Sequence, residues 1–180
     1  MYVASFDIET SNLSANFGIV LCAVIQPWQG KQIVIRKDEF DGVNSDDSKL
    51  VGAVIQELNR YNVLIAHNGV RFDRPFLNTR AAKWGLEPLS PRGNFVDPVF
   101  LARKHLRMSY NGLDTIAKYL HTKHQKTPLD PDLWVTAVLD QNKESLDQIV
   151  HHCKNDVFVL EEITEKLIGF VGRINEWGSA

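Results

Sequence analysis

The chain contains no run of 18 apolar residues and only two cysteines. A membrane-spanning helix needs about 20 predominantly apolar residues, so we expect no such helix. The N-terminus also lacks the basic region followed by an apolar one that is typical of a secretory signal. Cys22 and Cys153 have no C-x-x-C spacing, which favours free buried thiols in a reducing compartment. We therefore expect a cytoplasmic protein that neither spans nor binds a membrane.

The chain also lacks a large excess of either charge, since its formal net charge is −2. The charges are nevertheless unevenly distributed. Residues 71–107 carry eight Lys or Arg residues against three acids, and the chain from Leu129 onward carries four basic and ten acidic residues. The middle third is therefore either a local anion-binding surface or an ordinary solvated helix face.

At 180 residues and 44% hydrophobic composition, residues 1–180 fit one globular domain with a core of its own. The chain begins at Met1 and ends without an obvious linker, which favours a self-contained protein. Runs rich in β-branched residues predict an antiparallel meander followed by two shorter strands: 2–9, 18–26, 31–36, 62–66 and 94–96. Helical spacing of apolar residues and capping signals predict six helices: 47–61, 74–84, 98–106, 113–120, 131–140 and 143–174. This order predicts an α/β fold, with a mixed sheet flanked by helices.

Asp7 and Glu9 lie two residues apart in the first predicted strand. Side chains alternate along a strand, so these two carboxylates point to the same side, while Phe6 and Ile8 point to the other. Two anions held side by side at a partly buried edge repel each other and are poorly solvated. This pattern is typical of a divalent-metal site.

Two further carboxylates are candidates for the same site. Asp73 follows the apolar strand 62–66, at the edge where α/β sheets bind ligands, although it could equally cap the helix that begins at 74. Asp156 lies on the long last helix, at the boundary of its apolar stripe. Asp97 precedes Pro98, and we interpret it as a helix N-cap rather than as a fifth ligand.

Taken together, these acids and their neighbours resemble the DEDD superfamily of DnaQ-like 3′–5′ exonucleases, which have an RNase H-like fold. The resemblance rests on three motifs, which span nearly the whole chain: Phe-Asp-Ile-Glu-Thr at 6–10, His-Asn-Gly-Val-Arg-Phe-Asp at 67–73 and Cys-Lys-Asn-Asp-Val at 153–157. The chain is most similar to small stand-alone or phage-type members, which makes a bacterial or phage origin plausible. Their third motif usually reads Tyr-Cys-x-x-Asp-Val, and His152 replaces the Tyr here.

The resemblance implies a phosphodiester hydrolase that trims the 3′ ends of single-stranded DNA or RNA and releases nucleoside 5′-monophosphates. It implies two Mg²⁺ or Mn²⁺ ions about 4 Å apart, which activate a water and stabilise the leaving oxygen. The expected metal ligands are Asp7, Glu9, Asp73 and Asp156. The residues that it implies for substrate binding are Thr10, Leu13, His67, Asn68 and Phe72.

The general base is open between two neighbouring histidines. One branch of the family places a Tyr four residues before the last Asp, and the other places a His five residues before it. This chain has His152 and His151 at those positions. On a regular helix His152 lies about 40° from Asp156 and His151 about 140° away, so we favour His152. A kink near Val150 would favour His151 instead.

Other functions remain as alternatives. The fold could serve as a non-catalytic nucleic-acid-binding module, as a proofreading domain acting beside a polymerase, or as a nuclease that cuts internally. The presence of all four carboxylates favours an enzyme, and the second and third motifs favour trimming from an end. The sequence leaves DNA and RNA as equal candidates for the substrate.

Overall fold

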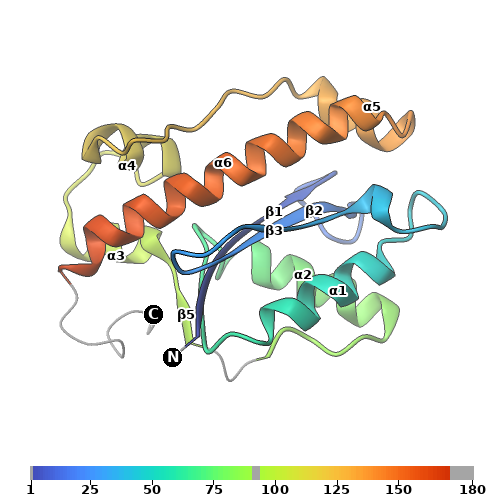
Figure 1. Cartoon of the computed structure of the whole chain (residues 1–180), viewed down its shortest axis with the longest axis horizontal. Coiled ribbons are helices and arrows are strands. Elements are labelled where there is room, and N and C mark those ends of the chain that lie inside the picture. Colours follow the sequence, from blue (N-terminus) through green and yellow to red (C-terminus); the bar gives the residue numbers. More distant parts are fainter. Residues whose placement is uncertain (1, 91–93, 171–180) are drawn as a thin grey trace.

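A computed structural model describes residues 2–90 and 94–170, and its centre is a five-stranded mixed sheet (Figure 1). The strand order is β3-β2-β1-β4-β5, so β1 lies in the middle. β1 pairs antiparallel with β2 and parallel with β4, β2 pairs antiparallel with β3, and β4 pairs parallel with β5. The strands are β1 (Val3–Thr10), β2 (Val20–Pro27), β3 (Ile33–Arg36), β4 (Val63–Ile65) and β5 (Asn94–Val96). The predicted α/β fold with an antiparallel meander and parallel strands is confirmed.

Helices cover both faces of the sheet. α1 and α2 lie on one face, and the long α6 crosses the other together with α3, α4 and α5 (Figure 1). The helices are α1 (Ser48–Leu58), α2 (Asp73–Trp84), α3 (Pro98–His105), α4 (Leu113–Leu120), α5 (Asp132–Leu139) and α6 (Lys143–Ile168), with a short 3₁₀ turn η1 at Lys37–Glu39. In the described ranges no helix combines the length and apolarity required to cross a membrane.

The predicted elements are all present, with shifted ends. The second strand begins at Val20 rather than at Gly18. Gly18 packs against the connection after β1, where a Cβ would lie 2.9 Å from that of Asn12. The third strand begins at Ile33 rather than at 31, and the first helix ends at Leu58 rather than at 61. The last helix ends at Ile168. Most of its predicted continuation to 174 lies outside the described residues.

Side chains alternate along β1, so one face of the strand contributes to the core and the other to the site. Ala4, Phe6 and Ile8 are buried in the core on the α1–α2 side of the sheet. Their neighbours Asp7 and Glu9 therefore project to the α6 side. β4 is buried on both faces, as expected for an interior parallel strand.

A buried ion pair joins the helices of the first face to the sheet. Arg80 of α2 donates from Nη2 to Asp47 at 2.6 Å, and both side chains are almost completely buried. Asp47 precedes α1 and also accepts hydrogen bonds from the Trp84 indole and from the backbone N–H of Val20. Arg80 donates further to the carbonyl of Ala15, in the connection that follows β1.

This pairing corrects the interpretation of the basic middle third. Arg80 belongs to the core and is unavailable to an external anion, whereas Arg71 and Lys104 are exposed. Arg92, another of the eight basic residues, lies outside the described residues.

We predict that Arg80→Ala lowers the free energy of unfolding by about 3–5 kcal/mol, because it leaves the buried Asp47 carboxylate without its cation. Arg60→Ala is the matched control, since Arg60 is exposed and its pair with Glu57 contributes at most about 1 kcal/mol. Urea denaturation monitored by circular dichroism measures both variants. Equal losses in the two would contradict a structural role for the buried pair.

Candidate active site

Asp7 and Glu9 lie at the carboxyl-terminal end of β1, beside α6. Glu9 is opposite Cys22 of β2, and the register shifts between Glu9 and Thr10. Asp7 Oδ2 lies 3.3 Å from the thiol of Cys153 on α6. Both cysteines are free and buried in the described structure, as the sequence predicted. The first two carboxylates are thus held between the sheet and the last helix.

Asp73 enters the site as the first residue of α2, directly after the loop that follows β4. It is 2% exposed, and its Oδ1 accepts the backbone N–H of Ile8 at 3.3 Å. Phe72, and not Asp73, occupies the N-cap position, and no side-chain cap bond is present there. The alternative reading of Asp73 as a simple helix cap is therefore wrong.

Asp97 supports this loop from behind. It caps α3 by accepting the N–H of Val99 at 3.0 Å, as predicted. It also accepts the backbone N–H of Asn68 at 2.9 Å and that of Val70 at 3.4 Å. The loop 67–72 is thereby fixed to α3, and Asp97 is occupied as an anchor.

Asp156 brings the fourth carboxylate to the same place from α6. Its Oδ2 accepts a hydrogen bond from Lys126 Nζ at 2.6 Å and lies 3.5 Å from His152 Nε2. Its Oδ1 is buried and has no hydrogen-bond partner among the described residues. A buried carboxylate oxygen without a partner is costly unless a cation or donor binds it.

The four carboxylates act on one another electrostatically. Burial, and then the charge of Asp156, raises the pKa of Asp7. Burial, and then Asp7, raises the pKa of both Glu9 and Asp73. Each group is therefore poorly solvated and repelled by its neighbours, which is the situation that a bound cation relieves.

The donor set fits divalent cations that prefer oxygen ligands, such as Mg²⁺ or Mn²⁺. The fit rests on the unpartnered Asp156 oxygen and on the crowding of carboxylates. In the part of the chain that the structure describes, no three His, Cys, Asp or Glu side chains form a preassembled ion-binding cluster. The ammonium of Lys126 brings positive charge to these acids. The negative charges of Asp156, Asp7 and Glu9 in turn raise the pKa of Lys126.

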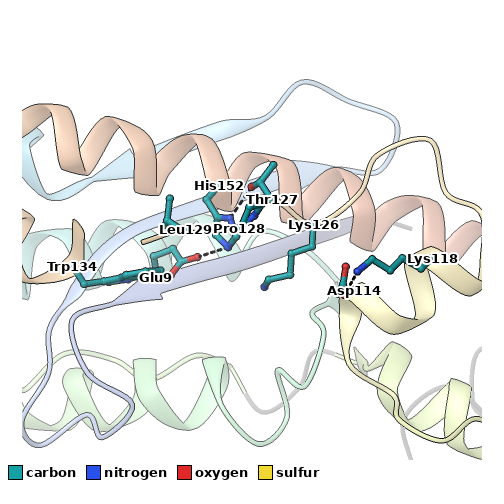
Figure 2. Close-up of a pocket in the computed structure, with 9 residues that line it drawn as sticks. All are labelled: Glu9, Asp114, Lys118, Lys126, Thr127, Pro128, Leu129, Trp134 and His152. Atoms are coloured by element: carbon teal, nitrogen blue, oxygen red, sulfur yellow. Dashed lines mark hydrogen bonds and ion pairs between the residues drawn. The ribbon is translucent and has the colours of Figure 1, made fainter. Parts of the chain in front are cut away.

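The two candidate histidines occupy different environments. His152 is buried, with Nε2 3.8 Å from Glu9 Oε1 and Nδ1 2.8 Å from Thr127 Oγ1 (Figure 2). His151 is exposed and lines a surface pocket to which His152 and Thr127 also contribute. α6 is helical without interruption through Val150, so the kink that would favour His151 does not occur. The structure places only His152 among the carboxylates.

Three residues of the site were missed by sequence reasoning: Lys126, Thr127 and Trp134. They line a cavity of about 620 Å³ beside Glu9 and His152 (Figure 2). Trp134 lies beside Glu9, and its side chain lowers the pKa of Glu9, against the larger raising effect of burial. Lys126 and Thr127 lie in a segment without helix or strand, so no periodic pattern marks them.

Four of the five predicted substrate residues fall into two groups. His67 and Asn68 line a second cavity of about 430 Å³, which shares Lys126 with the first. His67 is deeply placed there, and burial lowers its pKa to about 4. Leu13 and Phe72 line a smaller hollow of about 160 Å³ on the other side.

The members of the second group differ in exposure. Leu13 is 84% exposed, so its side chain is accessible to a ligand. Phe72 packs partly against Phe76 and the core. The Thr10 hydroxyl donates to the carbonyl of Asn12 and so stabilises the turn after β1.

Comparison with known proteins identifies relatives of this arrangement. A family model described as RNase H superfamily matches residues 4–168. A DNA polymerase III of PolC type from Ureaplasma parvum serovar 3 is 40% identical over 119 residues, which covers 54% of this chain and 8% of that protein. The family B DNA polymerase from the archaeon Pyrobaculum calidifontis matches with a TM-score of 0.76 and 19% identity, over 94% of this chain and 25% of that one. The chain thus spans a small part of either polymerase, and the second match shows likeness of fold.

We predict that Asp7→Asn stabilises the protein in EDTA and abolishes its stabilisation by Mn²⁺. The folded-state pKa values of Asp7 and Glu9 are raised to about 7 and about 9, so the folded state binds more protons than the unfolded state between about pH 4 and pH 9. Stability without metal must therefore fall as the pH rises through this window, and less steeply in the variant. Thermal unfolding at several pH values, with EDTA or Mn²⁺, measures both effects.

Asp132→Asn is the control, because Asp132 is an exposed carboxylate on α5. It should leave both the pH dependence and the Mn²⁺ response unchanged. An Asp7→Asn protein that Mn²⁺ stabilises as strongly as the parent would exclude Asp7 as a ligand.

Proposed function

The chain belongs to the RNase H superfamily, and we propose that it is a metal-dependent 3′–5′ exonuclease that releases nucleoside 5′-monophosphates from single-stranded nucleic acid. The observation that carries this proposal is that four carboxylates from three elements lie around the end of β1. His152 Nε2 lies 3.8 Å from Glu9 and 3.5 Å from Asp156, and Asp73 accepts the N–H of Ile8, the residue after Asp7. A phosphodiester hydrolase requires such a group to neutralise the charge that gathers on phosphoryl oxygens.

The four carboxylates would hold two Mg²⁺ or Mn²⁺ ions. When bound, such ions lower the pKa of water and stabilise developing negative charge on oxygen. Asp7 is the best candidate for a ligand shared by both ions, because it couples electrostatically to Asp73 and to Asp156. Asp156 Oδ1, which has no hydrogen-bond partner among the described residues, supports a role as a ligand.

His152 is the proposed general base. Its Nε2 faces the carboxylates, and its ring is held from behind by Thr127. An imidazole whose charged form is disfavoured is neutral near physiological pH and can accept a proton from the attacking water. Burial lowers the pKa of His152, which keeps the ring in this form.

Lys126 is the proposed donor to the substrate phosphate. Its ammonium lies within reach of the carboxylates, and it forms the boundary between the two larger cavities. Arg103 lines the second cavity and adds positive charge there. A strand bound across both cavities would thus place a phosphate beside Lys126, where a charge-assisted hydrogen bond to its oxygens can form.

A second candidate function is proofreading within a DNA polymerase. It is favoured by the comparisons, since both relatives are DNA polymerases of which this chain spans 8% and 25%. The two functions share their chemistry and differ in the partner. If trimming by the chain needs an added polymerase, the second function holds; if the chain alone is active, the first does.

We expect the purified chain to convert a 5′-labelled single strand into a descending ladder in Mg²⁺ or Mn²⁺ but not in EDTA. Separate DNA and RNA substrates determine the sugar preference, and gel electrophoresis resolves the products. One internal product would indicate an endonuclease. A mobility shift without cleavage would indicate a non-catalytic binding module.

We predict that His152→Ala lowers kcat by about 10²–10⁴, because the site loses its proton acceptor, while stabilisation by Mn²⁺ persists. His151→Ala is the matched control on the exposed side of the same helix and should retain parental kcat. Initial rates on the labelled strand measure both. If His152→Ala turned over at the parental rate, or if His151→Ala were the slower variant, the assignment of the base would be wrong.

A further inference from the structure

Residues 122–129, which we call the strap, connect α4 to α5 and run alongside α6 (Figure 1). The strap contains neither helix nor strand. It nevertheless carries Lys126 and Thr127, the two residues that contact Asp156 and His152. An irregular segment can hold such groups in place only if other contacts fix its backbone.

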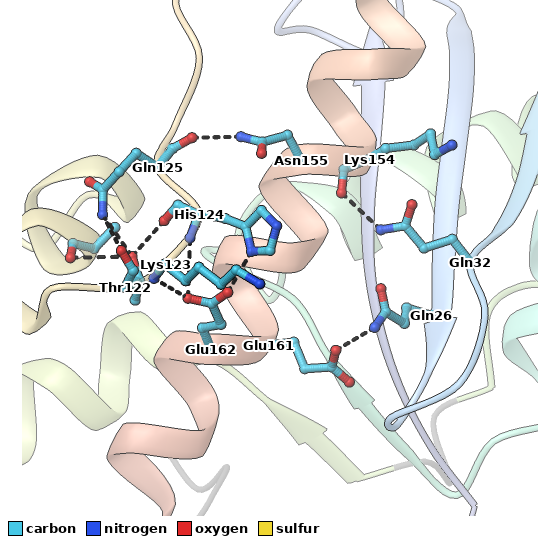
Figure 3. A network of polar contacts seen from close by, with 11 residues as sticks. Gln26, Gln32, Thr122, Lys123, His124, Gln125, Lys154, Asn155, Glu161 and Glu162 are labelled. Carbon is cyan, nitrogen blue, oxygen red and sulfur yellow. Dashed lines mark hydrogen bonds and ion pairs between the residues drawn. The ribbon is translucent and has the colours of Figure 1, made fainter.

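Two side chains of α6 supply these contacts (Figure 3). Glu162 accepts the backbone N–H groups of Lys123 and His124 through Oε2, and its Oε1 binds His124 Nδ1. Asn155 donates to the carbonyl of Gln125 at 2.6 Å. The strap is thus attached to α6 immediately before Lys126.

Hydrogen bonds within the strap stiffen the same stretch. The Thr122 hydroxyl donates to the carbonyl of His124 at 2.7 Å. The Gln125 amide donates back to the carbonyl of Thr122 at 2.7 Å. A shift of the strap at Glu162 would therefore move residues 122–125 together and displace the two site residues that follow.

The strap contacts the ring of His152 at one nitrogen, Nδ1. Nδ1 lies 2.8 Å from the Thr127 hydroxyl, which can either donate to this nitrogen or accept from it. If the hydroxyl accepts, Nδ1 carries the proton. The lone pair of Nε2 is then free on the side of Glu9 and Asp156, as a general base requires.

We propose that Glu162 is a positioning residue for the reaction: by holding the strap, it fixes the tautomer of His152 and the place of Lys126. It lies six residues after Asp156, about 9 Å further along the helix, and acts only through the strap. This inference rests on the proposed function for its kinetic consequence. Its structural consequence, the tautomer of His152, does not depend on any activity.

The kinetic test compares three variants. We expect Glu162→Ala to lower kcat by about 10-fold, as is usual when a group behind a catalytic residue is lost, and to raise KM because Lys126, the proposed donor to the substrate phosphate, is displaced as well. Glu162→Gln retains one carbonyl oxygen for the strap N–H groups and should recover most of the rate. Glu165→Ala removes an exposed glutamate from the next turn of α6 and should match the parent. Thermal unfolding of each variant shows whether a rate loss merely follows loss of fold.

The second test is spectroscopic. Long-range ¹H–¹⁵N spectra of the full chain report which ring nitrogen of His152 is protonated. We expect Nδ1–H in the parent and in Glu165→Ala, and a mixture of tautomers in Glu162→Ala. Should Glu162→Ala fail to fold, Asn155→Ala removes the other attachment of the strap and serves in its place.

The outcomes separate this inference from the proposed function. Parental kcat together with unchanged ring signals in Glu162→Ala would overturn it. A chain that degrades no nucleic acid but shows the tautomer change would overturn the proposed function and leave the role of Glu162 intact.

Discussion

Mutual repulsion among four carboxylates in one poorly solvated place is the constraint on which the rest of the structure depends. Burial and neighbouring charge raise the pKa values of Asp7, Glu9 and Asp73 together. A fold tolerates such a cluster when the carboxylates take up protons or when positive charge is brought to them. Lys126 provides positive charge here. It belongs to the strap, which hydrogen bonds with Glu162 and Asn155 attach to α6. The acids, the lysine and the strap are therefore best understood as one electrostatic unit.

Much of this unit was predictable because its signals are local. Strand alternation places Asp7 and Glu9 on the same side, and helical spacing places His152 rather than His151 beside Asp156. The RNase H-like fold followed from three short motifs together with the order of strands and helices, and the family match over residues 4–168 supports it. Periodicity of this kind depends only on residues near each other in the chain. It can therefore be recognised in the sequence without knowledge of tertiary contacts.

The parts that escaped prediction depend on contacts between distant residues. Thr127 and Lys126 have no periodic neighbours, and their importance appears only when the strap lies against α6. Asp97 was predicted as a cap, but the hydrogen bond that it accepts from the backbone N–H of Asn68 is seen only in the folded structure. Arg80 looked like surface charge until its pairing with Asp47 was seen. In each case one side chain serves two elements, and sequence spacing reveals only one of them.

The register of β1 has a consequence for how this protein can change over evolutionary time. The strand is paired on both sides, so inserting or deleting one residue would exchange its two faces. Asp7 and Glu9 would then point into the hydrophobic core, and Phe6 and Ile8 would point out of it. Such a change would destroy foldability and chemistry together. Diversification of this scaffold is thus confined to substitutions within the strand, and variation in length is left to the loops around it.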